Sequence, residues 1–354
     1  MSVQISIVHY ADRQRPRTAL SEVESMLVYN DILIMLIKSI KELTKYPYRL
    51  NIIDNQMDPV ARKDLEERLP NIEILRTEGP EWKIRHKDGH IVSGRHHTFP
   101  VGANLAMDTM KGDYLVMFHT DLLVSYNWLT SLVQNLKEME KNYGVPCATS
   151  PLLLPYPRSA RMPSEEEMLM KIRTRSGLTE PDNVKNYMDI HGVPNKMWGE
   201  IPVAINKPGL VTDNGHQLGG AYIASKRFFN EVGHYDPCIN RMNDKSYGIK
   251  TLTTRCKNTI SNHVYLHHIG GLHKRSGCYV QEHYSDKVIG SFAQFVYKWG
   301  RKVYRKTLKG GIWIELHQAQ VRDPSGGEGR RLVNKYMKEE YVEKPERYLE
   351  GGVR

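Results

Sequence analysis

Residues 113–125 of the chain read DYLVMFHTDLLVS. The apolar run that ends at Phe118 predicts a buried β-strand, and the polar residues His119 and Asp121 stand where that strand ends. An aspartate in this position often caps the turn that follows a strand. The other interpretation is that Asp121 holds a divalent cation at the carboxyl edge of a sheet. The choice between them depends on what the rest of the chain brings to the same edge.

On both sides of this strand, strand-like and helix-like segments alternate. Short β-branched or apolar runs predict the strands, and apolar residues at helical spacing predict the helices. This alternation is typical of an α/β fold with a mostly parallel, Rossmann-like sheet flanked by helices. The predicted strands are 5–10, 48–56, 71–77 and 113–121, and the predicted helices are 20–43, 59–69, 101–110 and 127–143.

Polar residues follow three of the predicted strands. His9 ends the first, Asp54 and Asn55 end the second, and His119 and Asp121 end the strand quoted above. In doubly wound sheets, ligands bind outside the carboxyl ends of the strands. We therefore expect these side chains to converge on one binding site.

The composition limits the classes of protein to be considered. The chain has 354 residues and a formal net charge of +10. No apolar run approaches the ~20 residues of a transmembrane helix, and the first residues lack the pattern of a secretory signal. The four cysteines have no CxxC spacing, which argues against a zinc ribbon or disulfide framework and favours a reducing, cytoplasmic compartment. The positive charge favours a phosphate-bearing partner, such as a nucleotide-activated substrate, a nucleic acid or an anionic membrane.

The pattern changes twice along the chain. Residues 151–215 are rich in proline, methionine and charge, without a clear period, which indicates an irregular insertion or an acceptor-side region within a domain of residues 1–285. Residues 286–354 form a basic, aromatic C-terminal extension, with the segment FAQFVYKWGRKVYRK at 292–306. Three interpretations of this segment stay open: an amphipathic helix that covers the core, a helix on an anionic membrane, and a surface that follows a polyanion such as a nucleic acid.

Several segments, taken in order, resemble the GT-A glycosyltransferases of the large family 2. They are NIIDNQMD (51–58), ANLAMDTMKGDYLVMFHTDLLVSYNWL (103–129), LGGAYIASKRFFNEVGHYDP (218–237), and ND at 243–244 followed by HHIGG at 267–271. The resemblance runs from Val3 to about Gly271. It implies a metal-dependent enzyme that moves a sugar from a nucleoside diphosphate donor, by family resemblance a UDP-linked one, to an acceptor hydroxyl with inversion.

The resemblance also implies roles for single residues. Asp54 would bind the nucleotide, although a DN pair is also a common turn cap. Asp121 takes the last position of the metal-binding DxD motif, and His119 takes its first. Imidazole suits Mn²⁺ better than Mg²⁺, so His119 is either a metal ligand or a contact to ribose or phosphate. His268 falls where the family has a further ligand of the metal or the diphosphate.

Asp244 falls where the family has the base that takes the proton of the acceptor, and its alternative role is a helix cap. Gly219 and Gly220 would let the backbone approach the sugar or the acceptor, or would serve a bend needed for packing. Arg95 is a candidate for phosphate contact and Asn104 for the nucleotide side of the site. Placement on the surface explains both nearly as well.

Two other functions stay open. The first is a retaining transferase on the same fold, which would tolerate loss of the Asp244 carboxylate. The second is a basic nucleic-acid-binding protein, or a glycosyltransferase of modified nucleic acid, on a degenerate GT-A core. The altered DxD motif keeps this alternative open, and the acceptor itself, a glycan, a lipid-linked glycan or a polyanion, is not identified by the sequence.

Overall fold

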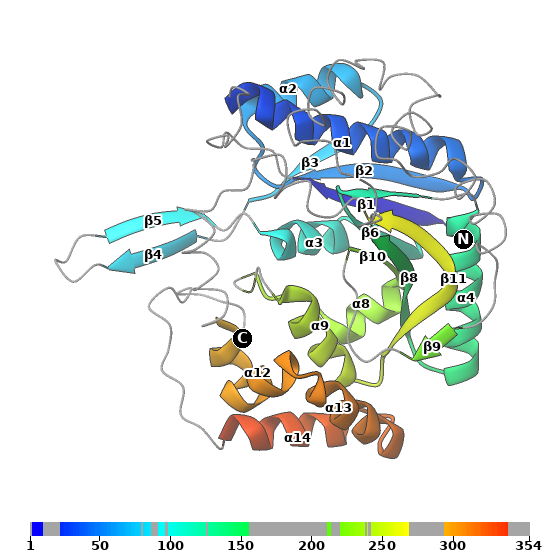
Figure 1. Cartoon of the computed structure of the whole chain (residues 1–354), viewed down its shortest axis with the longest axis vertical. Helices are drawn as coiled ribbons and strands as arrows, with labels where there is room; N and C mark the ends of the chain where they lie inside the picture. The colour runs from blue at the N-terminus through cyan, green and yellow to red at the C-terminus, as the bar shows by residue number, and fades with distance from the viewer. Residues whose placement is uncertain are drawn as a thin grey trace.

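The computed structural model describes residues 2–9, 22–78, 81–85, 91–95, 98–124, 127–155, 211–213, 220–237, 239, 242–268 and 294–338. A mixed sheet lies at the centre of the molecule, with helices around it (Figure 1). Within the described parts of the chain, no helix combines the length and the apolar character needed to cross a lipid bilayer.

The sheet has the strand order β3-β2-β1-β6-β10-β8-β11-β7, and β9 pairs with β11. Strands β1, β2, β3, β6, β8 and β11 run in one direction, whereas β7, β9 and β10 run in the other. The sheet is therefore mostly parallel, as the sequence predicts. Its strands are β1 (Val3–His9), β2 (Tyr48–Asp54), β3 (Glu73–Arg76), β6 (Tyr114–His119), β7 (Leu122–Leu123), β8 (Cys147–Pro155), β9 (Val211–Asp213), β10 (Ala221–Ser225) and β11 (Lys257–His268).

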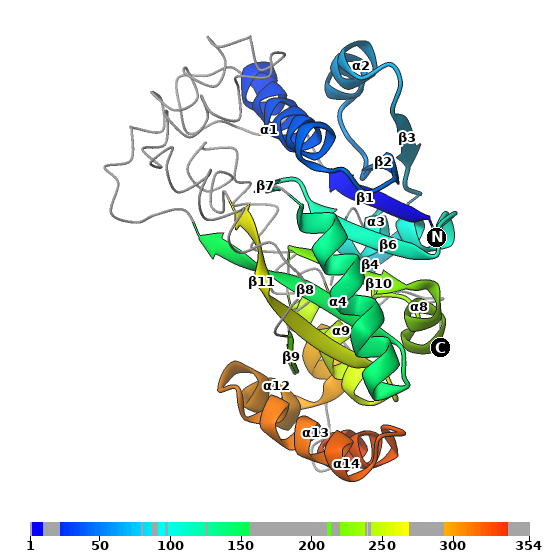
Figure 2. The same cartoon turned by 90° about the vertical axis from the view of Figure 1, so that its right-hand side faces the viewer.

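Helices cover both faces of the sheet (Figures 1 and 2). One apolar cluster joins the sheet to α1 (Glu22–Leu43), α2 (Pro59–Arg68) and α4 (Trp128–Tyr143). A second cluster joins it to α3 (Phe99–Asp108), α8 (Lys226–Val232) and α9 (Asn243–Leu252). We call these the α1 face and the α3 face of the sheet.

Alternation along β6 shows why the strand is buried on both sides. Val116 and Phe118 belong to the cluster on the α1 face, whereas Leu115 and Met117 belong to the cluster on the α3 face. Successive strand residues point to opposite faces, so a continuous apolar run is what a strand between two helical layers requires. This explains how the quoted stretch forms a central strand.

A helical C-terminal unit, residues 294–338, packs below the sheet in Figure 1. It contains a short helical segment at 294–299, α12 (Arg301–Leu308), α13 (Gly311–Arg322) and α14 (Gly327–Lys338). Phe295 and Trp299 are buried in a cluster with Ile249 and Leu252 of α9. The Trp299 indole also donates a hydrogen bond to Ser246 Oγ of α9, at 2.9 Å. Of the three interpretations of the basic, aromatic segment, the structure supports packing onto the core for these two aromatic residues.

Some predicted features differ from the structure or lie outside its described residues. The antiparallel direction of β10 is not evident from the sequence, because it depends on the long segment before the strand. The two-stranded hairpin of β4 (Glu81–Arg85) and β5 (Ile91–Arg95) was not predicted. Residues 156–210, most of the predicted insertion, and residues 269–293, which contain the predicted domain boundary, lie outside the described residues.

Candidate functional site

The parallel register aligns the carboxyl ends of the three central strands. His9 pairs with Asp54 across β1 and β2, and Val8 pairs with His119 across β1 and β6. Neighbouring strands lie about 4.8 Å apart. The backbone at these three strand ends therefore forms one continuous edge, as the sequence predicts.

The same edge continues to the late histidine. After β6, the chain passes through Asp121 into β7, where Leu122 pairs with His268 at the end of β11. At the end of β6, the backbone N–H of His119 donates to the carbonyl of Gly220 at 2.9 Å. Residues that lie up to 149 positions apart, His119 and His268, are thus brought to one end of the sheet.

The side chains at this edge leave the sheet on different faces. His9 and Asp54 each follow by two positions a strand residue of the α1-face cluster, so they point to that face. Phe118 also belongs to the α1-face cluster, which places the neighbouring His119 on the α3 face. The sequence pattern predicts the shared edge but does not separate these two groups.

Asp54 lies in a buried polar network on the α1 face. Its side chain is completely buried, and it accepts hydrogen bonds from the backbone N–H of Met57 at 2.6 Å and from Arg62 at 2.9 Å. Arg76 lies 3.8 Å away. A hydrogen bond with Glu66 is the main cause that raises the pKa of Arg62, and the charge of Asp54 adds to it. This geometry matches the turn-capping alternative, so a contact of Asp54 with a nucleotide stays a prediction.

His9 is the centre of a second buried network. Its Nδ1 lies 3.1 Å from Thr120 Oγ1 and its Nε2 lies 3.0 Å from Asn30 Oδ1. The Asn30 amide nitrogen donates to the Ala61 carbonyl at 2.8 Å and to the Asp64 carboxylate at 2.7 Å. With both amide hydrogens used in this way, Asn30 Oδ1 faces His9 as an acceptor, so His9 Nε2 must carry a hydrogen. The network thereby links α1 and α2 to Thr120.

Asp121 follows Thr120 and is buried, with 6% of its surface exposed. A carboxylate and an imidazole are a donor set that Mn²⁺ and other transition metals accept. Asp121 precedes Leu122, whose backbone pairs with His268, so the register brings these two positions to the same end of the sheet, and a cation held by Asp121 and His268 stays a prediction. Among the described side chains, no group of three or more His, Cys, Asp and Glu residues is clustered for metal binding, and the side chain of His268 is outside that set.

A row of aromatic contacts joins His119 to α9. The rings of His119 and Phe99 lie 4.1 Å apart, those of Phe99 and Tyr235 6.0 Å, and Tyr235 stacks on Tyr247 at 3.9 Å. Burial raises the pKa of Tyr235 well above its usual range, and the negative charge of Asp244 adds to this. Tyr247 belongs to α9, the helix that carries Asp244. The aromatic contacts therefore connect α9, the helix of the candidate base Asp244, to His119 at the end of β6.

Asp244 is the second residue of α9, which begins at Asn243. Met242 takes the N-cap position with a φ of 62°, and no side chain caps the helix there. The carboxylate of Asp244 therefore lies in the first helical turn and is half-buried. A negative charge in this turn is stabilised by the helix dipole, a role that is compatible with catalysis.

Asn104 has a clear structural role. Its amide nitrogen donates to the carbonyl of Tyr235 at 3.0 Å, and its amide oxygen accepts from the N–H of Tyr235 at 2.8 Å. The amide nitrogen and the amide oxygen of Asn104 are therefore both hydrogen-bonded to the backbone of Tyr235. Asn104 thus holds the loop that carries Tyr235, and a contact with the nucleotide stays a prediction.

The other predicted site residues are only partly described. Gly220 has a φ of 80°, and a Cβ there would lie 2.9 Å from Leu153 Cδ1, so the backbone itself requires glycine. Arg95 pairs with Glu81 in the hairpin, and its side chain is outside the described residues. Gly219 is outside them as well.

Sequence reasoning missed four residues of the site: Phe99, Tyr235, Thr120 and Asn30. Asn30 carried a signal, because it and Asp31 are the polar residues within a largely apolar stretch of a helix, and such residues are buried only with partners. The aromatic residues carried none, because a phenylalanine at the start of a helix and a tyrosine two residues after a glycine are common in any core.

No model of a known protein family matches the sequence, and no curated protein shows a significant match. Several solved structures are similar to the chain. A structure of GalNAc-T7 with UDP, GalNAc and Mn²⁺ is 15% identical with a TM-score of 0.49, and the match covers 96% of this chain and 56% of that one. Residues 1–349 of S. aureus TarS are 10% identical with a TM-score of 0.43, covering 97% and 93% of the two chains. The same TarS fragment in complex with UDP is 9% identical, with a TM-score of 0.42.

The chain thus spans about half of the GalNAc-T7 chain that it matches. Identities of 9–15% and TM-scores below 0.5 do not assign an activity to this chain.

Proposed function

We propose that the chain is a glycosyltransferase of the GT-A type, which moves a sugar from a nucleoside diphosphate donor to an acceptor hydroxyl with the help of a divalent cation. The observation that carries the proposal is the backbone register at one edge of the sheet. That register joins the strand end at His119, the following Asp121 and the late His268, through the Leu122 pairing. These are the positions where the sequence resembles the family.

The residues at this edge suit three tasks. Asp121 and His268 would hold the cation, and His119, on the α3 face, would contact the same ligand or the ribose. When bound, such a cation would stabilise the negative charge of the departing diphosphate. Asp244, at the start of α9, would take the proton of the acceptor hydroxyl. The row of aromatic rings from Phe99 to Tyr247 would keep α9 in place. It would also exclude water from the space between Asp244 and the cation.

Donor binding is the first test. UDP with Mn²⁺, the ligands named for the GalNAc-T7 structure, is a suitable first probe, followed by a panel of sugar nucleotides whose slow hydrolysis is measured. We expect binding that depends on the cation and is lost in Asp121→Asn. The matched control is Asp113→Asn, because Asp113 precedes the same strand at its opposite end, where it accepts from the Ser2 backbone. Cation-independent binding, or equal loss in both variants, would count against the proposal.

Stereochemistry is the second test, once an acceptor is found. We propose inversion, because the role we propose for Asp244 is that of a base, and inverting transfer needs one. NMR of the first product formed reports the anomeric configuration directly. A retained configuration would replace the inverting mechanism with the retaining one and leave the donor-binding result untouched.

A further inference from the structure

The C-terminal unit carries most of the net charge of the chain. Residues 294–338 contain eleven Lys or Arg residues against three Asp or Glu residues, which is eight of the ten net positive charges. A surplus of this size on 45 residues creates a strong local field, which attracts polyanions or anionic surfaces.

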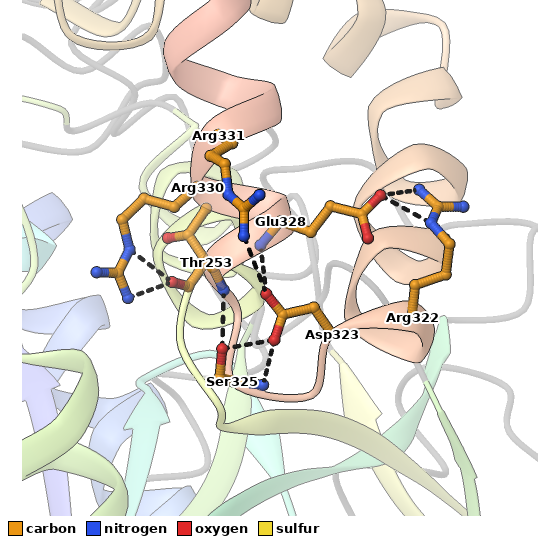
Figure 3. Close-up of polar contacts among 8 residues, drawn as sticks. Thr253, Arg322, Asp323, Ser325, Glu328, Arg330 and Arg331 are labelled. Atoms are coloured by element: carbon orange, nitrogen blue, oxygen red, sulfur yellow. Dashed lines mark hydrogen bonds and ion pairs between the residues drawn. The ribbon is translucent and has the colours of Figure 1, made fainter.

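The three carboxylates of this unit are engaged inside it, and Figure 3 shows the contacts of two of them, Asp323 and Glu328. Asp323 accepts from the backbone N–H of Glu328 at 2.8 Å, and Glu328 accepts from Arg322 Nε at 2.7 Å. Glu315, on α13, accepts from Lys306 and from Tyr336 Oη. The acidic groups therefore organise the helices, and they leave a basic outer surface.

None of the Phe, Tyr and Trp side chains described in the unit is exposed, whereas three aliphatic side chains are. Phe295 is fully buried, and Trp299 and Trp313 are each 8% exposed. The exposed residues are Leu308, Ile314 and Val321, with 56%, 63% and 65% of their surface accessible.

The exposed aliphatic residues are arranged along the helices. Ile314 and Val321 are seven positions apart, so they share one face of α13. Leu308 ends α12, three residues before α13 begins. On α12, Leu308 shares a helix face with the exposed Arg301 and Arg305.

We propose that this surface, Leu308, Ile314 and Val321 with the surrounding basic residues of α12, binds an anionic lipid membrane. Aliphatic side chains enter the boundary between headgroups and acyl chains, and the basic residues pair with lipid phosphates. A single-stranded nucleic acid would instead need exposed aromatic rings for stacking on bases. In the described residues of this unit Phe295, Trp299, Trp313 and Tyr336 are buried, and Tyr297 and Tyr304 are half-buried, so no aromatic ring there is exposed and the observations favour the membrane. The inference does not depend on the proposed function.

Vesicle co-sedimentation tests the inference with the full chain. We expect binding to phosphatidylcholine vesicles that contain 30% phosphatidylglycerol, on the order of tenfold stronger than binding to phosphatidylcholine alone, and weaker as salt increases. The triple variant Leu308→Ser, Ile314→Ser and Val321→Ser should lose binding by about tenfold or more. Arg301→Glu with Arg305→Glu should reduce it as well.

Val60→Ser on α2 is the matched control, because Val60 is another large apolar residue that is exposed, at 41%. It should bind vesicles as the unchanged protein does. The substituted side chains are exposed, so thermal unfolding should confirm that every variant folds. The proposal is overturned if anionic vesicles are not bound, if neutral vesicles are bound equally well, or if the serine variant binds unchanged. Tighter binding to single-stranded DNA or RNA than to anionic vesicles at the same salt concentration would overturn it in favour of a nucleic acid partner.

Discussion

His9 and Thr120, which are 111 positions apart in the chain, meet in a hydrogen bond of 3.1 Å beneath the edge of the sheet. Through its other ring nitrogen, His9 is held by Asn30 of α1. Thr120 immediately precedes Asp121. The position of the candidate metal ligand therefore depends on a buried imidazole that does not itself have to touch the ligand.

Two substitutions of His9 test its hydrogen bonds to Thr120 and to Asn30 one at a time. An asparagine amide reaches the place of Nδ1 and keeps the bond to Thr120, whereas a glutamine amide reaches the place of Nε2 and keeps the bond to Asn30. Each variant loses one buried hydrogen bond, at about 1–3 kcal/mol of stability. We expect His9→Gln to weaken Mn²⁺-dependent UDP binding by roughly 10–100-fold, as residues behind metal ligands do, and His9→Asn to weaken it much less.

Titration calorimetry of UDP with Mn²⁺, alongside thermal unfolding, measures both quantities for these two variants. If the two variants lose the same affinity in proportion to their lost stability, His9 has a purely structural role.

Asp244→Asn separates catalysis from binding. The substitution removes the proton acceptor and keeps the size and the position of the side chain in the first turn of α9. We expect transfer to fall by roughly 10²–10⁴-fold, while the affinity for UDP with Mn²⁺ changes less than about twofold. Initial rates with a competent acceptor, together with UDP titrations, check this. Transfer at the normal rate would favour the retaining alternative.

Gly326 supports the contact between α14 and the end of α9. It has a φ of 79°, and a Cβ there would overlap the carbonyl oxygen of Thr254. Gly326→Ala should therefore lower the free energy of unfolding by roughly 1–3 kcal/mol. Gly311→Ala is the control, because Gly311 begins α13 with open space around it, and it should be neutral or stabilising by about 0.5–1 kcal/mol. Urea unfolding of both variants gives the comparison, and an equal effect at the two sites would show that the close approach is not required.

Lys250 gives a pH-dependent stability. Burial, with a further contribution from Lys298, lowers its pKa from 10.5 to about 8. Between pH 8 and 10.5 the unfolded chain holds a proton that the folded chain has released, so this group adds stability as the pH rises through that window. Below about pH 8 its unfavourable contribution is fully present.

Lys250→Met removes this dependence. The stability of the variant relative to the unchanged protein should therefore be highest near pH 7.5 and should decrease by pH 10. Urea unfolding at the two pH values measures it, with the exposed Lys309→Met as a control for the loss of a positive charge. A difference that stays constant across the window would contradict the assignment.

The central strands could be predicted because their signal is local. The apolar run before His119 predicts β6, and the predicted strands 5–10 and 48–56 end within two residues of His9 and Asp54, where β1 and β2 end. The register that follows from parallel pairing predicts one shared edge. The alternation along a strand also predicts which side chains share a face of the sheet. It does not predict which helix covers that face, and the surroundings of each side chain depend on that.

The partners of the site residues could not be predicted, because they come from distant segments. Asp54 is satisfied by Arg62, whose position depends on the direction in which α2 leaves the edge. Asn104 is used by the backbone of Tyr235, which lies 131 positions further along the chain. A motif assigns a type of chemistry to a residue, whereas these contacts depend on the tertiary arrangement.

The bond between Trp299 and Ser246 has a practical consequence for the layout of the protein. Ser246 stands two positions after Asp244, and the apolar side of α9 is covered by the terminal helices. A version of the protein shortened before residue 294 would uncover Ile249 and Leu252 and release α9, the helix that carries the proposed base Asp244. The C-terminal unit, although the sequence alone suggests a separate extension, is a structural support of that helix.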